Sequence, residues 1–416
     1  MAKVIIKGGK RLKGTVRVSG AKNAALPILA AVTMLEGDSK IENVPRLTDI
    51  TTMVRMLRTL GLKAEYVNHH VKISNKKTSL KHLIPYELVT KMRASFFIAG
   101  PILAKTGFVK IPLPGGCAIG TRPVDIHLKG FEALGAKIEV EHGFIDLKAK
   151  KLKGNDVNLS FPSVGATENV MMAATLAEGT TRIKNAAREP EVEDLANFLI
   201  AAGAKIKGQG TDMIEIEGVS KLTGVNYKVI PDRIEAGTLM LASAITDGDV
   251  HIDGVNKSHL LPLLEKMREM GIKVVVVGDK ASVTRNGILK PIELETQPYP
   301  GFPTDMQAQV MALLSITPGT SMVKETIFEN RFMHAQELTR MGANIKVKDR
   351  VAIINGVEKL SGAPVRTTDL RAGAALWLAG LVAEGETLIY DIEHVERGYD
   401  NLQGKLLSLG AHIRKV

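Results

Sequence analysis

The sequence contains one cysteine, and it lies in a segment rich in proline and glycine. Cys117 stands in LPGGCAIGTRP, directly after Gly115 and Gly116 and five residues before Arg122. Proline and glycine in this arrangement are typical of a loop that can close over a site. A nearby cation favours the thiolate, which is the reactive form of cysteine. A lone cysteine is more often a small buried hydrophobic residue, but this loop is a poor place to bury one, and we take Cys117 as a candidate reactive residue.

Basic residues recur at the starts of apolar helices and in the loops before amphipathic helices. A helix start favours an anion by about 0.3–2 kcal/mol, and an arginine fork binds phosphate or carboxylate through two hydrogen bonds. The sequence therefore predicts sites for multiply charged anions. Basic residues can instead form structural ion pairs, and we favour that role for Arg46, Arg188, Arg233 and Lys257. For Lys22, Arg122, Arg331, Arg371 and Arg397 a functional role is favoured because of the family resemblance described below.

One acidic residue has two possible roles that the sequence leaves open. Asp305, in PGFPTDMQAQ, begins an expected apolar helix. Its carboxylate could cap that helix or act as a general base on a substrate hydroxyl. The histidines, including His69 and His70, show no metal-ligand spacing, and no GxxxxGK[ST] phosphate loop is present. We therefore expect no metal ion and no nucleotide-hydrolysing site.

The elements that position these residues come from six copies of one repeat of roughly 70 residues. A helix-ending phrase marks each copy: LGLKAEY, LGAKIEV, AGAKIKG, MGIKVVV, MGANIKV and LGAHIRK. A second phrase, in which glycine precedes a strand, recurs in the same phase, as in EGTTRIKNA and DGDVHIDGV. Two phrases that recur in one phase indicate true repeats.

Each repeat is predicted to contain an apolar helix, a strand, an amphipathic helix that ends at glycine, and a hairpin of two strands. The first helices are apolar on every side, as in NVMMAATLAEG, which predicts burial all round. Alternating runs such as NIKV predict half-buried strands. Asn286-Gly287 and Asn355-Gly356 predict tight hairpin turns.

The two ends of the chain are predicted to share one repeat. The sixth copy stops after HIRKV, whereas the chain begins with VIIKGG, which matches VAIING of the fifth copy. The N-terminal strand should therefore complete the sixth repeat. We predict an α/β fold with two domains of three repeats, residues 22–229 and residues 1–21 plus 230–416.

The composition of the chain indicates its cellular compartment and the class of its binding partners. A single cysteine cannot form an internal disulfide, and the N-terminal residues do not resemble a secretory signal, which favours the cytoplasm. No apolar run approaches the roughly 20 residues needed to cross a bilayer, so we expect no membrane insertion. The net charge of +11 indicates an anionic partner. Because the basic residues are dispersed and aromatics make up only 4% of residues, small anionic ligands are favoured over nucleic acid.

Several motifs together resemble the enolpyruvyl transferases, in particular those that act on UDP-N-acetylglucosamine. The resemblance covers essentially the whole chain and rests on GAKNAALP, MRASFF, LPGGCAIGTRPVDIH, SVGATENVMMAATLAEGTT, PDRIEAGT, YPGFPTDMQAQ, DLRAGAALWLAGLVAEGET and EHVERGYDNL. It implies two inside-out, barrel-like α/β domains of three repeats each. It also implies transfer of the enolpyruvyl group of phosphoenolpyruvate to the 3-hydroxyl of UDP-N-acetylglucosamine, with release of phosphate, at the first committed step of peptidoglycan synthesis.

The resemblance implies a role for each matching residue. Cys117 would be the proton donor, would form an adduct with phosphoenolpyruvate and would be alkylated by fosfomycin; Asp305 would be the base, with Asp369 supporting the site. Phosphoenolpyruvate would be bound by Lys22, Asn23, Arg122, Arg331, Arg371 and Arg397. The sugar nucleotide would be bound by Asn23, Arg93, Arg122, Pro123, Val124, Asp125, Ile126, Ser163, Val164, Gly165, Asp305 and Ile327. No cofactor is implied.

Two positions depart from some members of that family, and other functions compete with this one. Phe97 stands where others carry tryptophan, and Phe161 where others carry a lysine near the diphosphate. One alternative is transfer to shikimate 3-phosphate, whose enzymes lack the cysteine loop. The others are a basic nucleic-acid-binding module and a non-catalytic paralogue that binds the sugar nucleotide; the presence of Lys22, Cys117 and Arg397 argues against the paralogue.

Overall fold

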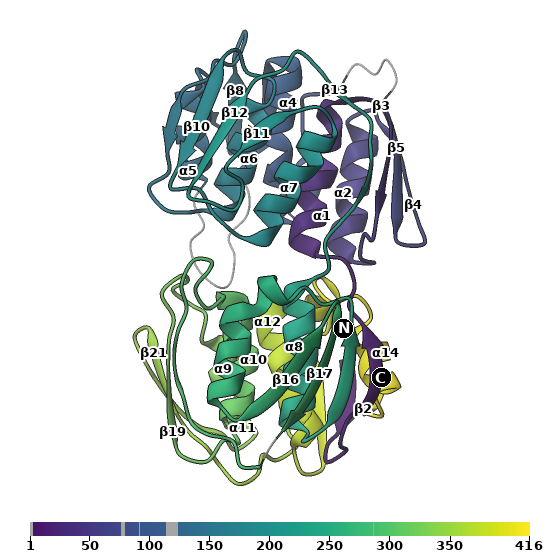
Figure 1. Cartoon of the computed structure of the whole chain (residues 1–416), viewed down its shortest axis with the longest axis vertical. Coiled ribbons are helices and arrows are strands. Elements are labelled where there is room, and N and C mark those ends of the chain that lie inside the picture. The colour runs from purple at the N-terminus through teal and green to yellow at the C-terminus, as the bar shows by residue number, and fades with distance from the viewer. Residues whose placement is uncertain (1–2, 76–79, 91, 114–123, 286) are drawn as a thin grey trace. The chain divides into compact units, whose positions relative to one another are not determined.

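The computed structural model describes residues 3–75, 80–90, 92–113, 124–285 and 287–416 (Figure 1). These residues divide into two compact units. Unit 1 comprises residues 3–19 and 231–416, and unit 2 comprises residues 20–113 and 124–230. The limits predicted from the sequence, 22 and 229, lie within a few residues of these boundaries. The segment from Pro114 to Pro123, which contains Cys117 and Arg122, lies outside the described residues.

Unit 2 contains the first three repeats, with helices and strands in the predicted order. The first has α1 (Lys22–Ala31), η1 (Val32–Met34), β3 (Leu35–Glu42), α2 (Thr48–Thr59), β4 (Lys63–Val67) and β5 (His70–Asn75). The second has α3 (Tyr86–Val89), η2 (Arg93–Ile98), α4 (Ala99–Thr106), β6 (Phe108–Pro112), α5 (Asp125–Ala133), β7 (Lys137–Glu141), β8 (Phe144–Lys148) and β9 (Asp156–Asn158). The third has α6 (Val164–Ala174), β10 (Thr180–Lys184), α7 (Pro190–Ala201), β11 (Lys205–Lys207), β12 (Met213–Glu217), β13 (Leu222–Thr223) and β14 (Asn226–Lys228).

Unit 1 contains the other three repeats and the N-terminal strands β1 (Lys3–Lys7) and β2 (Lys13–Arg17). The fourth has α8 (Arg233–Ile245), β15 (Asp249–Asp253), η3 (Lys257–Leu260), α9 (Leu261–Glu269), β16 (Ile272–Val277), β17 (Lys280–Arg285) and β18 (Glu293–Glu295). The fifth has α10 (Thr304–Leu314), β19 (Thr320–Lys324), α11 (Met333–Arg340), β20 (Asn344–Lys348), β21 (Val351–Asn355) and β22 (Pro364–Arg366). The sixth has α12 (Leu370–Val382), β23 (Glu386–Tyr390), α13 (Glu393–Glu396), α14 (Leu402–Ser408) and β24 (His412–Lys415).

The N-terminal strand completes the sixth repeat, as predicted. β1 pairs antiparallel with both β23 and β24, which is the place that β21 takes between β19 and β20 in the fifth repeat. The first and last strands of the chain are therefore neighbours in one sheet.

A parallel strand from the preceding repeat extends the sheets and closes each unit into a ring. In unit 1, β18 pairs with β19, β22 with β23, and β2 returns to β15. In unit 2, β9 pairs with β10, and β13 and β14 return to β3, while the link to β6 is a single parallel bridge between Leu83 and Lys110. The repeats within a unit therefore support one another in a cycle.

The first helices of the repeats form the interior of each unit, and the sheets cover the outside (Figure 1). In unit 1, α8, α10 and α12 pack against one another, and every residue of α8 from Ile234 to Ile245 is buried. Helices inside and sheets outside confirm the predicted inside-out α/β class. The strands lie in separate sheets among the described residues. No helix in the described ranges is long and apolar enough to span a membrane.

One predicted turn is wrong, and another lies outside the described residues. Asn355 is the last residue of β21, and the hairpin before it turns at Asp349, whose φ is 54°. Gly356 is required for another reason, because a Cβ atom there would lie 1.6 Å from the carbonyl oxygen of Thr317. The second predicted turn includes Asn286, which is not described.

Candidate active site

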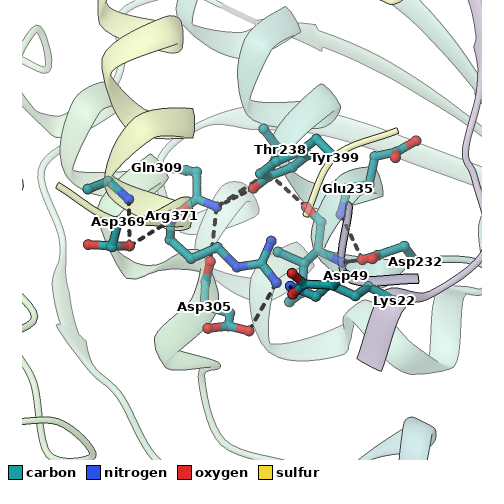
Figure 2. Close-up of polar contacts among 12 residues, drawn as sticks. Lys22, Asp49, Asp232, Glu235, Thr238, Asp305, Gln309, Asp369, Arg371 and Tyr399 are labelled. Atoms are coloured by element: carbon teal, nitrogen blue, oxygen red, sulfur yellow. Dashed lines mark hydrogen bonds and ion pairs between the residues drawn. The ribbon is translucent and has the colours of Figure 1, made fainter. Parts of the chain in front are cut away.

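Asp305 lies in the first turn of α10, where two arginines hold its carboxylate. Nη2 of Arg331 is 2.8 Å from Oδ1. Nη2 of Arg371 is 3.1 Å from Oδ2 (Figure 2). Pro303 is the N-cap residue, and no side chain caps the helix. The helix-capping role that the sequence left open for Asp305 is therefore excluded. The side chains of both arginines are almost fully buried, whereas that of Asp305 is 27% exposed. Two guanidinium groups therefore hold one carboxylate.

Arg371 begins the buried helix α12, and its surroundings fix its side chain. Oδ1 of Asp369, the N-cap, accepts hydrogen bonds from the N–H groups of Arg371 at 2.8 Å and Ala372 at 3.1 Å. The guanidinium lies 5.4 Å from the ring centre of Tyr399. Burial opposes its charge, but the charge and hydrogen bond of Asp305, together with Tyr399 and Asp232, outweigh burial, and the pKa of Arg371 lies above its ordinary value. Its Nε and Nη1 atoms are buried and have no hydrogen-bond partner among the described residues. A fixed cation with donors of this kind suits an anionic ligand.

A buried polar network supports the first turn of α10 from behind. Nε2 of Gln309 donates to the carbonyl oxygen of Asp305 at 2.9 Å and to the hydroxyl of Tyr399 at 3.0 Å. It also lies 3.3 Å from the hydroxyl of Thr238 on α8, which is 3.0 Å from that of Tyr399 (Figure 2). The position of Asp305 is thus fixed by three elements. Sequence reasoning missed Gln309, Thr238 and Tyr399, because uncharged residues within apolar helices look like core.

Arg397 and Ile327 lie on other segments of unit 1. Arg397 is the half-buried C-cap residue of α13, two residues before Tyr399. The N–H of the half-buried Ile327 donates to Oε1 of Glu325 at 2.9 Å. Both predicted residues thus adjoin residues of the Asp305 cluster or its supports.

Lys22 of unit 2 is the first residue of α1, and it forms a buried ion pair. Its Nζ lies 2.6 Å from Oδ2 of Asp49 on α2, and the two side chains are only 11% and 5% exposed (Figure 2). Asn23 follows Lys22 in the first turn. Sequence reasoning missed Asp49, because an acidic residue in the first turn of an amphipathic helix is also a common response to the helix dipole.

The remaining predicted residues of unit 2 lie at the starts of helices that pack together. Arg93 begins η2, Asp125 begins α5, and Ser163 caps α6 by accepting from the N–H of Ala166 at 3.4 Å. Helix α6 contacts both η2 and α5. The other predicted residues beside these starts are Val124, Ile126, Val164 and Gly165. The structure therefore brings together segments that are distant in the sequence.

His127 lies behind these helix starts. It is buried, its Nδ1 lies 3.1 Å from Nδ2 of Asn169, and burial followed by the charge of Arg93 lowers its pKa to about 3. A Cβ atom on Gly165 would approach Cε1 of His127 to 3.2 Å and a ring carbon of Phe97 to 3.6 Å. Glycine therefore lets the start of α6 pack closely on its neighbours.

The described residues contain no group of three or more His, Cys, Asp or Glu side chains suited to a metal ion. The absence of a bound metal or cofactor stays a prediction. The predicted site residues Cys117, Arg122 and Pro123 fall outside the described ranges.

Comparison with known proteins decides the family. Residues 6–406 match the family model of EPSP synthase (3-phosphoshikimate 1-carboxyvinyltransferase). The chain is 56% identical to UDP-N-acetylglucosamine 1-carboxyvinyltransferase 2 of Carboxydothermus hydrogenoformans, over 100% of both chains. It is 54% identical to UDP-N-acetylglucosamine 1-carboxyvinyltransferase 1 of Halalkalibacterium halodurans, over 100% of this chain and 95% of the relative. The chain belongs to the enolpyruvyl transferase family.

Solved structures of other enolpyruvyl transferases share the fold. The enolpyruvyl transferase NikO from Streptomyces tendae matches with a TM-score of 0.91 and 26% identity, over 100% of this chain and 99% of NikO. EPSP synthase from Acinetobacter baumannii matches with a TM-score of 0.76 and 20% identity, over 100% of both chains. The second likeness concerns the fold alone.

Proposed function

We propose that this enolpyruvyl transferase moves the enolpyruvyl group of phosphoenolpyruvate to the 3-hydroxyl of UDP-N-acetylglucosamine and releases inorganic phosphate. The proposal rests on the sequence identity, over the full length, to relatives whose names state this activity. The product would serve peptidoglycan synthesis, as the resemblance of the motifs implies.

The charge around Asp305 supports binding of phosphoenolpyruvate, which carries a phosphate and a carboxylate. Arg331 and Arg371 are two buried cations beside Asp305, and the Nε and Nη1 atoms of Arg371 have no hydrogen-bond partner among the described residues. In our proposal these two arginines, with Lys22, Arg122 and Arg397, hold the two anionic groups. Buried cationic forks of this kind stabilise the charge that develops during the reaction.

In the proposed reaction, Asp305 takes the proton of the sugar hydroxyl. The sugar oxygen bonds to the phosphate-bearing carbon of phosphoenolpyruvate while the methylene carbon gains a proton from an acid, for which we propose Cys117. The tetrahedral product then loses phosphate and one methyl proton, which restores the double bond. An anion that draws the N–H groups of Arg331 and Arg371 away from Asp305 raises the proton affinity of its carboxylate.

The helix starts of unit 2 support binding of the sugar nucleotide. The N–H groups at the start of α6, after the Ser163 cap, and those at the start of α5 suit phosphate oxygens. In our proposal Asn23, Arg93, residues 122–126 and residues 163–165 contact UDP-N-acetylglucosamine. The proposed contacts also include Asp305 and Ile327.

Phosphate release from phosphoenolpyruvate tests this function. The purified protein is assayed with UDP-N-acetylglucosamine and, in parallel, with shikimate 3-phosphate, each with and without fosfomycin pretreatment. We expect release that depends on the nucleotide sugar and stops after fosfomycin. Release with shikimate 3-phosphate alone, or no release with either acceptor from folded protein, would contradict the proposal.

Two variants of one residue test the proposed acid. Cys117→Ser should lose turnover steeply, whereas Cys117→Asp, which still donates a proton, should keep part of it and resist fosfomycin. Equal loss in both variants would contradict an acid role for Cys117.

A further inference from the structure

Glu325 is a buried carboxylate that binds two segments of unit 1 at once. It follows β19 and is 1% exposed. Its Oε1 accepts from the N–H groups of Ile327 at 2.9 Å and Phe328 at 3.1 Å. Its Oε2 accepts from the hydroxyl of Thr304, the first residue of α10, at 2.9 Å. One side chain therefore joins the 327–328 segment to the helix that carries Asp305.

The equivalent position in other repeats has a different conformation. The residue directly after the matching strand is Asn43, Asn185, Gly254 or Asp391, with φ values of 57°, 56°, 80° and 58°. These residue types tolerate the left-handed region. Glu325 does not adopt it. The fifth repeat thus departs from the backbone pattern that four others share.

In the three of those repeats that have a side chain at this position, that side chain binds the neighbouring parallel strand or the residue after it. Nδ2 of Asn43 donates to the carbonyl oxygen of Val229 at 2.9 Å, and Nδ2 of Asn185 to that of Leu159 at 2.9 Å. Each acceptor follows the adjacent strand, β14 or β9. The carboxylate of Asp391 likewise pairs with Arg366 of β22 at 2.6 Å. The usual role of this position is therefore local and structural.

In the fifth repeat a pair of threonines makes that tie instead. The N–H of Thr326 donates to the hydroxyl of Thr296, directly after β18, at 2.9 Å, and the hydroxyl of Thr326 donates to the carbonyl oxygen of Thr296. Glu325 is thereby released from the role of its counterparts. Its carboxylate is directed to the 327–328 segment and α10 instead.

The contacts of Glu325 connect to Asp305, the candidate base, by two routes. From Glu325 the chain leads to Phe328, whose ring centre lies 5.4 Å from the guanidinium of Arg331. Arg331 pairs with Asp305, whose neighbour Thr304 returns to Glu325. The 327–328 segment therefore packs beside the residues that surround the candidate base.

We propose that Glu325 is a positioning residue that fixes Ile327 and Phe328 relative to Asp305 and thereby sets the acceptor hydroxyl against the base. This inference rests on the proposed function, because it takes UDP-N-acetylglucosamine as the acceptor substrate. Glu325 itself does not touch the reacting atoms. Its substitution should therefore affect the acceptor more than phosphoenolpyruvate.

The first test compares Glu325→Ala with Glu325→Gln. Alanine removes both acceptor oxygens, and we expect kcat/KM for UDP-N-acetylglucosamine to fall about a hundredfold, as for a misplacement near 1 Å, with the KM for phosphoenolpyruvate unchanged. Glutamine keeps an oxygen for the two N–H groups and an amide beside the hydroxyl of Thr304, so it should restore most of the loss. Equal effects on both substrates, or no rescue by glutamine, would indicate a merely structural role and overturn the proposal.

A second variant keeps the proposal testable if Glu325→Ala does not fold. Thr304→Val removes only the hydroxyl that links Glu325 to α10, with little change in shape. We expect kcat to fall about tenfold through displacement of Asp305, with normal thermal unfolding. Kinetic constants equal to those of the unchanged protein would overturn the proposed link.

Asp391→Gly is the matched control, because it removes the side-chain tie to Arg366 at the equivalent position of the next repeat. Glycine tolerates the left-handed conformation, and we expect unchanged kinetic constants for both substrates. A loss like that of Glu325→Ala would show that any tie after these strands has the same effect, which would overturn a special role for Glu325.

Amide hydrogen exchange separates failure of this inference from failure of the proposed function, because it needs no substrate. Glu325→Gln should leave exchange at Ile327 and Phe328 slow, whereas Glu325→Ala should accelerate it, and Asp391→Gly should not. Slow exchange in Glu325→Ala would overturn the inference whatever acceptor the enzyme uses. Failure of the unchanged protein to use UDP-N-acetylglucosamine would overturn the function alone.

Discussion

Both units have an ion pair at the start of a first helix, but the number of cations that hold the carboxylate differs. In unit 2, Lys22 on α1 meets Asp49, one cation against one carboxylate, and both side chains are nearly inaccessible. In unit 1, Asp305 on α10 meets both Arg331 and Arg371, and its carboxylate is 27% exposed.

The difference shows how one repeat serves two purposes. The ion pair of Lys22 and Asp49 is buried, so removal of either residue should lower stability strongly, in addition to any loss of activity. In the Asp305 cluster two arginines hold one partly exposed carboxylate, so the fold should depend less on either arginine, and the buried donors of Arg371 suit an anionic ligand. Substitutions in the Asp305 cluster should therefore lower activity more than stability, whereas substitutions in the Lys22–Asp49 pair should lower stability strongly.

Arg371→Met should cause the largest loss of activity. Removal of a buried cation aimed at developing charge lowers kcat by about a hundred- to a thousandfold. The free energy of unfolding should change little, because Asp305 is partly exposed and keeps Arg331. Phosphate-release kinetics and urea unfolding measure the two effects. Arg371→Lys is the control and should recover little activity, because lysine lacks the planar fork; full recovery would mean that charge alone is needed.

Lys22→Met should cause the largest loss of stability. It leaves the buried carboxylate of Asp49 without its counter-charge from Lys22, which costs about 3–5 kcal/mol of unfolding free energy. Urea unfolding checks this value. The double variant Lys22→Met with Asp49→Leu should recover most of the stability without activity. If the single variant is as stable as the unchanged protein, the contrast between the two units does not hold.

The smallest expected effect is the pH dependence of stability, which comes from one buried neutral histidine in each unit. Burial, and then Arg93, lower the pKa of His127 to about 3, and burial lowers that of His334 to about 4. Between about pH 6.5 and these values the unfolded chain binds a proton that the folded protein does not, so stability is full above pH 6.5 and falls as the pH falls. The loss is about 1.4 kcal/mol per pH unit for each histidine.

His127→Gln tests the contribution of unit 2. Glutamine can still accept from Asn169, and the slope of unfolding free energy between pH 6.5 and 5 should decrease by about 1.4 kcal/mol per unit. Urea unfolding at several pH values gives the slope. An unchanged slope would show that His127 binds its proton equally in the folded protein.

Much of the fold and part of the site could be predicted from local patterns. The apolar first helices, such as α8 and α12, predicted helices that are buried all round, and the match of VIIKGG to VAIING predicted the partners of β1. The turn at Asn355-Gly356 was wrong because a glycine required for close packing against Thr317 resembles a glycine required for a turn. Asp49 and Glu325 were missed because neither residue belongs to a recurring pattern.

The sequence by itself determined the six repeats, the completion of the last repeat by the first strand, and the residue types available for anion binding. These follow from hydrophobic periodicity and from phrases that recur along the chain. Only the tertiary structure decided which charges meet, because Lys22 and Asp49, or Asp305, Arg331 and Arg371, come from separate elements. It also decided that Glu325 is buried between two segments, since hydrogen bonding of a buried carboxylate depends on neighbours that are distant in sequence.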